Sequence, residues 1–187
     1  MRIISGNFKG RKIFQPKDKL TRPLKDLTKE SIFNIIKHSN KFDIDIEKSN
    51  ILDLFSGVGS FGLECLSRGA STVTFVENYK EVLPMLKKNI TNLNCLNKCE
   101  IIEKDIFSQL DLSNLKAKFD IIFMDPPYKE NGLYTLLEKI IKTKILKKNG
   151  LFIVHRHKKE NDEFPSNFHL IEQKIYGISK IIFGYCR

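Results

Sequence analysis

From residue 50 onward, short apolar segments typical of strands alternate with segments in which apolar residues recur at helical spacing. Seven segments are predicted as strands, at residues 51–55, 72–77, 100–105, 119–125, 151–155, 170–176 and 180–185. Helices are predicted at residues 61–67, 80–92 and 133–144. Because alternating strands and helices form parallel sheets covered on both faces, the pattern predicts an α/β fold with a mostly parallel seven-stranded sheet. The last two strands flank Gly177 and predict an antiparallel hairpin.

The first 45 residues do not follow this alternation and predict a small N-terminal extension. Glycines and prolines between residues 6 and 23 separate short apolar pieces, which indicates an extended arm or a small hairpin. A helix is predicted near residues 25–38, followed by a polar linker. We therefore expect an arm and helix over residues 1–45 and the main domain over residues 46–187.

Positive charge is concentrated in that extension. The 187 residues include 32 Lys and Arg and 22 Asp and Glu, a formal net charge of +10. Residues 1–29 hold nine of the basic and two of the acidic side chains, a local net charge of +7. Such clustering favours a polyanionic partner, because binding to phosphates releases counterions. A generally lysine-rich composition is the alternative explanation for the overall charge.

The cysteines and the first residues give no sign of an oxidising or membrane environment. None of the four cysteines, Cys65, Cys95, Cys99 and Cys186, has the C-x-x-C spacing of redox or zinc sites, and we expect no metal site. The chain shows no signal peptide and no apolar run of membrane-spanning length. A cytoplasmic protein with reduced thiols is therefore expected.

The string GVGSFG at residues 57–62 is a G-x-G-x-x-G motif directly after a predicted strand and before a predicted helix. Gly57 and Gly59 allow the backbone to approach a ligand closely at a helix N-terminus. Glu77 lies twenty residues after Gly57, at the end of the second predicted strand, where its carboxylate can accept hydrogen bonds from both ribose hydroxyls. Together these residues predict an adenosine-containing cofactor, either NAD or S-adenosylmethionine.

Two carboxylates favour S-adenosylmethionine over NAD. Asp53 lies in the first predicted strand, close to the glycine turn, where it would repel a pyrophosphate. A cofactor that carries a sulfonium and an amino group is compatible with that negative charge. Asp105 ends the third predicted strand and could accept a hydrogen bond from an adenine amine. The alternative for Asp105 is a cap on the following turn.

The fourth predicted strand ends in Asp125, Pro126, Pro127 and Tyr128. The two prolines fix φ and remove two N–H donors, which leaves a rigid set of acceptors beside an aromatic ring. The Asp125 carboxylate and the Pro126 carbonyl can accept both N–H groups of an exocyclic amine, while Tyr128 stacks on its base. A base inside paired nucleic acid must first be unstacked. The motif therefore predicts methyl transfer to an amino group on a base.

These residues resemble the class I S-adenosylmethionine-dependent methyltransferases, and more narrowly the RsmD type of bacterial 16S ribosomal RNA guanine-N2 methyltransferases. The resemblance spans almost the whole chain. The matching strings are MRIISG at 1–6, KGRK at 9–12, TRP at 21–23, LDLFSG at 52–57, LSRGA at 66–70, FVE at 75–77 and DPPY at 125–128. The N-terminal strings narrow the family, because several amine methylases share the last one.

The resemblance implies a Rossmann-like enzyme that transfers a methyl group from S-adenosylmethionine to the N2 amine of a guanine in 16S rRNA. A monomer acting on the small ribosomal subunit or an assembly intermediate is expected. The implied cofactor-binding residues are Asp53, Phe55, Gly57, Gly59, Glu77, Asn78, Asp105 and Ile106. The implied catalytic residues are Asp125, Pro126, Pro127 and Tyr128. The implied RNA-binding residues are Lys9, Arg11, Lys12 and Arg22.

The chain departs from the family pattern at two places. Leu24, Lys25 and Leu27 stand where threonines and a further arginine are usual. The run HRH at residues 155–157 follows the fifth predicted strand, where a glutamate is common, and is interpreted as a polar strand end near the substrate mouth with some affinity for phosphate. Two alternatives stay open: a DNA adenine-N6 or other amine methyltransferase, and a non-catalytic RNA-binding assembly factor.

Overall fold

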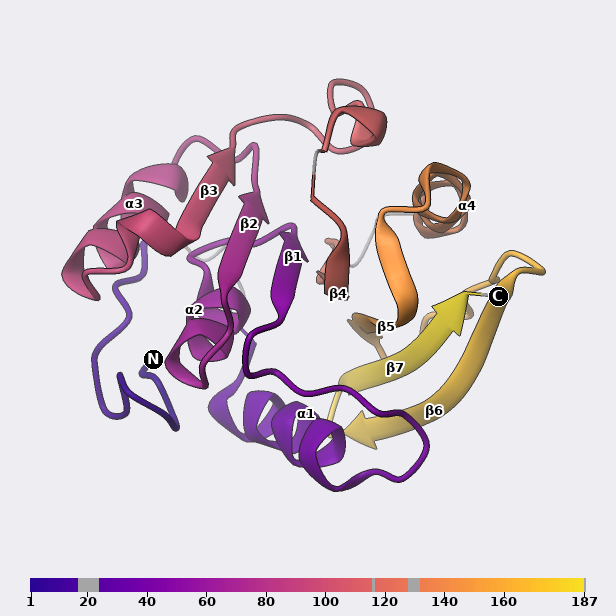
Figure 1. Cartoon of the computed structure of the whole chain (residues 1–187), viewed down its shortest axis with the longest axis horizontal. Coiled ribbons are helices and arrows are strands. Elements are labelled where there is room, and N and C mark those ends of the chain that lie inside the picture. Colours follow the sequence, from indigo (N-terminus) through magenta and orange to yellow (C-terminus); the bar gives the residue numbers. More distant parts are fainter. Residues whose placement is uncertain (17–23, 116, 128–131, 187) are drawn as a thin grey trace.

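The computed structural model describes residues 1–16, 24–115, 117–127 and 132–186 of the chain (Figure 1). The strands are β1 Asn50–Leu54, β2 Thr72–Val76, β3 Cys99–Ile102, β4 Phe119–Met124, β5 Leu146–His157, β6 Phe168–Tyr176 and β7 Ser179–Cys186. The α-helices are α1 Asp26–His38, α2 Ser60–Ser67, α3 Leu83–Asn92 and α4 Leu133–Thr143. Two short 3₁₀ helices are η1 Leu96–Lys98 and η2 Leu112–Asn114.

The strands form one mixed sheet in the order β3-β2-β1-β4-β5-β7-β6. Strands β1 to β5 run parallel to one another, whereas β7 runs antiparallel between β5 and β6. The predicted fold class and terminal hairpin are therefore confirmed. The predicted start of the fifth strand at residue 151 is wrong, because β5 begins at Leu146. Leu146 pairs with Phe119 across a register shift, and the polar residues that follow it conceal this extension in the sequence.

Strands β1 and β4 are neighbours at the centre of the sheet, and the chain connects outward from them in opposite directions. Open α/β sheets bind ligands outside the carboxyl ends of the strands at such a switch point. Leu54 pairs with Met124 in register, so the turn after β1 and the DPP segment after β4 leave the sheet side by side. Topology alone therefore brings the glycine motif and the proline motif together.

Two apolar layers cover the sheet because side chains alternate between its faces. Ile51 and Phe123 lie in the layer formed with α1, α2, α3 and the first residues of the chain. Leu52 and Ile122 lie in the opposite layer, formed with α4 and η2 (Figure 1). Among the described residues, no helix is both long and apolar enough to cross a membrane.

The first 13 residues form a small hairpin, which is one of the two arrangements predicted for them, the other being an extended arm. Arg2 and Lys12 form an antiparallel bridge, and the Ile3 N–H donates to the Arg11 carbonyl at 2.9 Å. Ile3 and Ile13 are buried in the same apolar layer as α1 and α2. The division into residues 1–45 and 46–187 stays a prediction, and the structure adds that the two parts share a core.

Candidate active site

The turn between β1 and α2 depends on backbone conformations that glycine adopts readily. Gly57 and Gly59 have φ values of 55° and 80°, and Phe55 also has a positive φ of 59°. Positive φ is uncommon for a bulky residue and is concentrated at ligand-binding turns. The α2 backbone begins directly after Gly59, and its N-terminal end lies on the glycine turn. The turn thus places backbone N–H groups and a helix N-terminus at the switch point.

Asp53 is buried beneath this turn with one oxygen engaged. Its Oδ2 accepts a hydrogen bond from the Gly62 N–H at 3.0 Å, whereas Oδ1 has no hydrogen-bond partner among the described residues. Burial raises the pKa of Asp53 above its ordinary range; the Gly62 hydrogen bond opposes this shift, while the charges of Asp125 and Glu77 add to it. Three carboxylates thus meet at the carboxyl ends of β1, β2 and β4. Carboxyl groups at this edge of the sheet fit a cofactor with sulfonium and ammonium groups, because their oxygens accept from an ammonium and an ionised carboxylate attracts positive charge.

Glu77 connects the end of β2 to the glycine turn. One carboxylate oxygen accepts from the Gly57 N–H at 2.7 Å, and the other accepts from the N–H groups of Asn78 and Tyr79 at 2.9 Å each. These bonds fix the orientation of the carboxylate, and the oxygen that accepts only from Gly57 retains capacity for a further donor. The position predicted for ribose recognition is therefore occupied by an oriented carboxylate.

Asp105 caps the turn that follows β3. This is the role that the sequence offers as the alternative to adenine recognition. Its Oδ1 accepts from the N–H of Phe107 and from both the N–H and the hydroxyl of Ser108. Its Oδ2 accepts from Asn78 Nδ2 at 2.7 Å, which links the ends of β3 and β2. The hydrogen bonds from Ser108, followed by those from Phe107 and Asn78, lower the pKa of Asp105 despite some desolvation. Ile106 is buried beside this turn, and the Phe107 ring lies 5.8 Å from that of Phe55.

Asp125 follows β4 directly and is held from two sides. Its N–H donates to the Leu54 carbonyl at 3.3 Å, and its Oδ1 lies 2.8 Å from Nδ1 of His155. Its Oδ2 has no hydrogen-bond partner among the described residues, and the side chain is 22% exposed. Pro126 is buried and Pro127 is exposed. Tyr128, the fourth predicted catalytic residue, lies outside the described residues.

The predicted phosphate affinity of residues 155–157 is wrong for the first two of them. His155 and Arg156 are buried, and both make hydrogen bonds with residues of the DPP segment. Arg156 donates to the Pro127 carbonyl at 3.4 Å, while its Nε donates to Asp162 at 2.7 Å. Charged residues at the end of a strand usually face solvent, so the sequence pattern does not indicate that His155 and Arg156 have buried hydrogen-bond partners.

Asn89 is a further residue that the sequence did not single out. It is fully buried on α3 and donates to the carbonyls of Val58 and Phe14 at 3.0 Å each. Its Oδ1 accepts from the Phe14 N–H at 2.7 Å. The side chain therefore ties the N-terminal hairpin to the glycine turn. A polar residue on the apolar face of a predicted helix is the signal that could have identified it.

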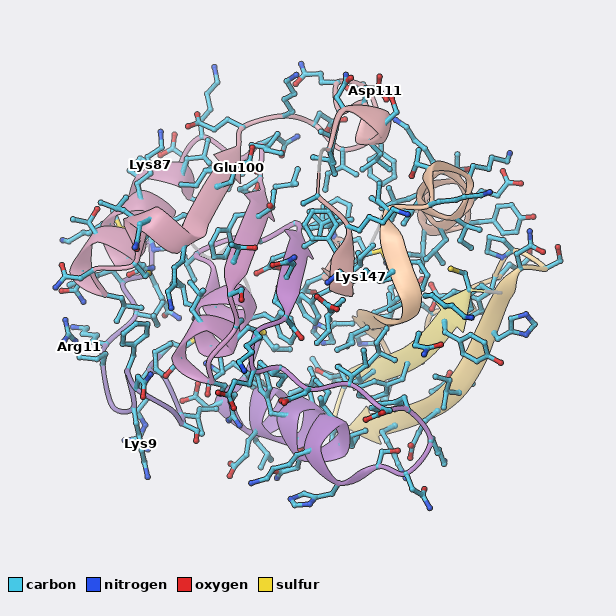
Figure 2. The ribbon with its side chains drawn as sticks, in the orientation of Figure 1. Lys9, Arg11, Lys87, Glu100, Asp111 and Lys147 are labelled. Carbon is cyan, nitrogen blue, oxygen red and sulfur yellow. The ribbon has the colours of Figure 1, made fainter. Side chains whose placement is uncertain are left out.

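The candidate RNA-binding residues lie on the outer side of the hairpin. Lys9, Arg11 and Lys12 are exposed, and Figure 2 shows Lys9 and Arg11 at the edge of the molecule, pointing away from the sheet. Nearby on α3, Lys88 Nζ lies 4.1 Å from the centre of the Phe14 ring. Arg22 lies outside the described residues. In the ranges that the structure describes, no group of His, Cys, Asp or Glu side chains is arranged to hold a metal ion.

Comparison with known proteins identifies the family. The profile of the family described as conserved hypothetical protein 95 matches residues 1–185. The chain belongs to this family. A relative from Haemophilus influenzae named ribosomal RNA small subunit methyltransferase D is 35% identical over 179 residues, covering 95% of this chain and 90% of the relative. A relative of the same name from Buchnera aphidicola is 36% identical, covering 92% of this chain and 86% of the relative.

The solved structures agree with this family. A structure from Escherichia coli, provisionally named a methyltransferase, superimposes with a TM-score of 0.82 at 26% identity, covering 100% of this chain and 98% of the other. The predicted class I methyltransferase fold and the resemblance to the RsmD type are both confirmed. The family and its fold establish a methyltransferase whose cofactor is S-adenosylmethionine, and the carboxyl groups at the switch point fit this cofactor.

We expect Gly57→Ala to weaken cofactor binding by this methyltransferase more than it weakens the fold. A Cβ at Gly57 would meet no described atom within 4 Å, so the substitution creates no clash within the protein. Its positive φ would cost about 1–2 kcal/mol for a residue with a Cβ. The added methyl group would point into the space above the turn and reduce affinity for S-adenosylmethionine by an expected 10-fold or about 1.4 kcal/mol.

Gly177→Ala is the matched control for this prediction. Gly177 lies in the β6–β7 turn with a φ of 63°, and an added Cβ there also meets no described atom within 4 Å. The midpoint of thermal unfolding should fall similarly in both variants, whereas titration calorimetry should show weakened cofactor binding only for Gly57→Ala. Equal cofactor affinity in the two variants would contradict a role for the Gly57 turn.

Proposed function

We propose that this methyltransferase transfers a methyl group to the exocyclic N2 amine of a guanine in 16S ribosomal RNA. One observation carries the proposal: Asp125 leaves β4 beside the glycine turn with one carboxylate oxygen held by His155 and the other without a partner among the described residues. An unpartnered acceptor on a proline-rigid segment suits an amine that has two N–H groups and no freely available lone pair.

The chemistry at Asp125 concerns the protons of the amine. S-adenosylmethionine supplies an electrophilic methyl group when it is bound. Asp125 Oδ2 would accept one N–H of the guanine amine, and the Pro126 carbonyl would accept the other, which turns the nitrogen lone pair toward the methyl carbon. In the transfer the S–C bond of the cofactor would break as the N–C bond forms, and the proton lost by the amine would pass to the Asp125 carboxylate and from there to water. Alignment of the reacting atoms supplies much of the rate enhancement.

The cofactor-binding role of the switch-point residues belongs to the same proposal. The turn at residues 53–59, including Phe55, would hold the methionine part, and Glu77 with Asn78 would bind the ribose. Asp105 and Ile106 would contact the adenine. The hydrogen bonds that orient Glu77 and Asp105 support these assignments, because a fixed carboxylate binds a ligand without first losing rotational freedom.

The rRNA substrate is supported by the names of the relatives and by the exposed basic hairpin. We expect Lys9→Gln combined with Lys12→Gln to weaken binding to small-subunit RNA while leaving cofactor affinity unchanged. Each RNA phosphate that the variant no longer neutralises should reduce the slope of log affinity against log salt by about 0.7 to 0.9. Filter binding over a salt series measures this slope.

The control for that prediction removes the same charge elsewhere. Lys142 and Lys144 are exposed at the end of α4, on the opposite layer of the sheet. The pair Lys142→Gln and Lys144→Gln should leave the salt slope unchanged. If both double variants lose RNA affinity equally, the hairpin has no special role and only the overall charge matters.

Incubation of the protein with methyl-labelled cofactor tests the substrate class. Small ribosomal subunits from cells that lack the corresponding methyl group, duplex DNA and ribosomal proteins should be offered in parallel. Label in the RNA of the subunits alone is the expected result. Label in duplex DNA or in protein would overturn the proposed substrate and favour another amine methyltransferase.

A further inference from the structure

His155 lies beside the carboxylate of Asp125. It belongs to the segment 155–157, which departs from the family pattern. β5 is parallel to β4, and the pairing of Met124 with Val154 places the next residues of both strands together. His155 Nδ1 lies 2.8 Å from Asp125 Oδ1, and His155 Nε2 lies 2.9 Å from Ser179 Oγ. His155 and Ser179 are buried, at 5% and 6% exposure, whereas Asp125 is partly open to solvent.

The three side chains define a direction of hydrogen bonding. An ionised carboxylate only accepts, so the hydrogen between Asp125 and His155 lies on Nδ1. In a neutral imidazole Nε2 is then an acceptor, and the Ser179 hydroxyl donates to it. The Asp125 carboxylate thus selects the tautomer in which His155 presents a donor to it, and the Ser179 hydroxyl, which can donate or accept, completes the hydrogen bonding of the buried ring. The order of the residues resembles a hydrolase triad, but the buried Ser179 lies at the closed end and Asp125 at the open end.

We propose that His155 is a positioning residue for Asp125, with Ser179 holding the far side of the His155 ring. This proposal deepens the proposed function and rests on it. The Nδ1–H bond occupies Oδ1 and fixes the rotation of the carboxylate, so that Oδ2 is the oxygen left to accept the N–H of the substrate amine. A carboxylate free to rotate would sample orientations in which neither oxygen meets the amine. His155 itself contacts no reacting atom in this arrangement.

Kinetics of two His155 variants separate positioning from a merely structural role. His155→Leu removes the donor and keeps a similar volume, and it should lower kcat by about 100-fold, the scale expected for a misplaced reacting group. The KM and the affinity for S-adenosylmethionine should stay unchanged, since the glycine turn is untouched. His155→Asn places an amide N–H near the position of Nδ1 and should restore most of kcat. His38→Leu, at an exposed position in the last turn of α1, is the control and should retain wild-type kcat.

Two kinetic results would overturn the proposal: wild-type kcat in His155→Leu, or equal losses in His155→Leu and His155→Asn. Thermal unfolding and cofactor titration of each variant identify any that fail to fold. If His155→Leu fails to fold, the kcat of His155→Asn is compared with that of the wild type, and a loss as large as about 100-fold would overturn the proposal. If the wild-type protein methylates a different amine, the proposed function fails while the same kcat comparison on that acceptor still tests positioning.

Nitrogen NMR tests the arrangement without any substrate. In protein with ¹⁵N-labelled histidine, the signals missing from His155→Asn identify the His155 ring. The expected spectrum shows a protonated Nδ1, and Asp125→Ala should produce a mixture of tautomers, because the ring then loses the acceptor that holds the Nδ1 proton. A ring without a proton on Nδ1 in the wild type would overturn the proposal, whether or not the protein methylates guanine.

Discussion

Asp125→Asn should reduce methyl transfer by about 100-fold to 10,000-fold, the range expected when a group that handles a proton in the transition state is lost. The amide is nearly isosteric with the carboxylate, and its oxygen can still accept from His155 Nδ1. The amide nitrogen then occupies the place of Oδ2 and presents two N–H donors to the N–H groups of the substrate amine. Single-turnover assays with saturating cofactor and RNA measure the loss.

Asp120→Asn is the control on the same strand. Asp120 lies near the opposite end of β4, where its carboxylate accepts from Lys147 and from the Asn50 N–H at 2.8 Å each. This variant should keep wild-type turnover, and both variants should keep wild-type affinity for S-adenosylmethionine. A non-catalytic assembly factor would instead keep its cellular function when Asp125 is replaced by Asn. A wild-type protein without turnover, together with an Asp125→Asn variant that still functions in cells, would favour this alternative.

Glu64→Ala should lower the free energy of unfolding by about 3–5 kcal/mol, the cost of breaking a buried ion pair by removing one partner. Glu64 on α2 is fully buried and accepts from the N–H groups of Ile4 at 2.8 Å and Ser5 at 3.0 Å, while Lys29 Nζ lies 3.4 Å from it. Its removal leaves the Lys29 charge and two backbone donors of the hairpin without their carboxylate. Urea denaturation measures the free energy, and hydrogen exchange should show lost protection at Ile4 and Ser5.

Glu138→Ala is the matched control, because Glu138 also pairs with a lysine on its helix but both side chains are exposed. Its cost should be below about 0.5 kcal/mol. A cost below about 1 kcal/mol for Glu64→Ala, within the range of an exposed pair, would contradict the role of Glu64 in holding the hairpin.

The cost of Glu64→Ala should also depend on pH. Burial lowers the pKa of Lys29, and the charges of Glu64 and Asp26 oppose that lowering. In the variant the pKa falls further, so the folded protein releases the Lys29 proton at a lower pH than the unfolded chain does. Between these two pKa values the unfolded chain binds more protons, and stability rises with pH. The difference from wild type should therefore shrink as the solution becomes alkaline.

The sequence predicted the sheet and its switch point because both follow from local patterns. The alternation of strands and helices determines the layers, and the two loop motifs lie directly after strands that become neighbours at the centre. The apolar pattern does not indicate the start of β5, because the polar residues Lys147 and Lys148 interrupt it and the strand continues through a register shift. The start of α3 was placed three residues early, since its first turn is set by Pro84 rather than by apolar spacing.

The partners of the site residues could not be predicted, because they depend on strand register and on packing. His155 and Asp125 are thirty residues apart, and only the pairing of β4 with β5 shows that they meet. Glu64 similarly appears in the sequence as an ordinary helical glutamate, and its burial arises from the hairpin that covers it. Local sequence patterns thus identify the candidate catalytic and cofactor-binding residues, whereas the residues that orient them can be identified only from the folded structure.

Mass spectrometry of nucleosides from methylated small-subunit RNA tests the proposed guanine-N2 methylation most directly. Small subunits lacking the methyl group should be treated with the protein and S-adenosylmethionine, digested to nucleosides and compared with an Asp125→Asn reaction. We predict N2-methylguanosine as the product of the wild-type protein and its absence from the variant reaction. A methyl group on another atom of guanine, or on adenine, would contradict the proposed function.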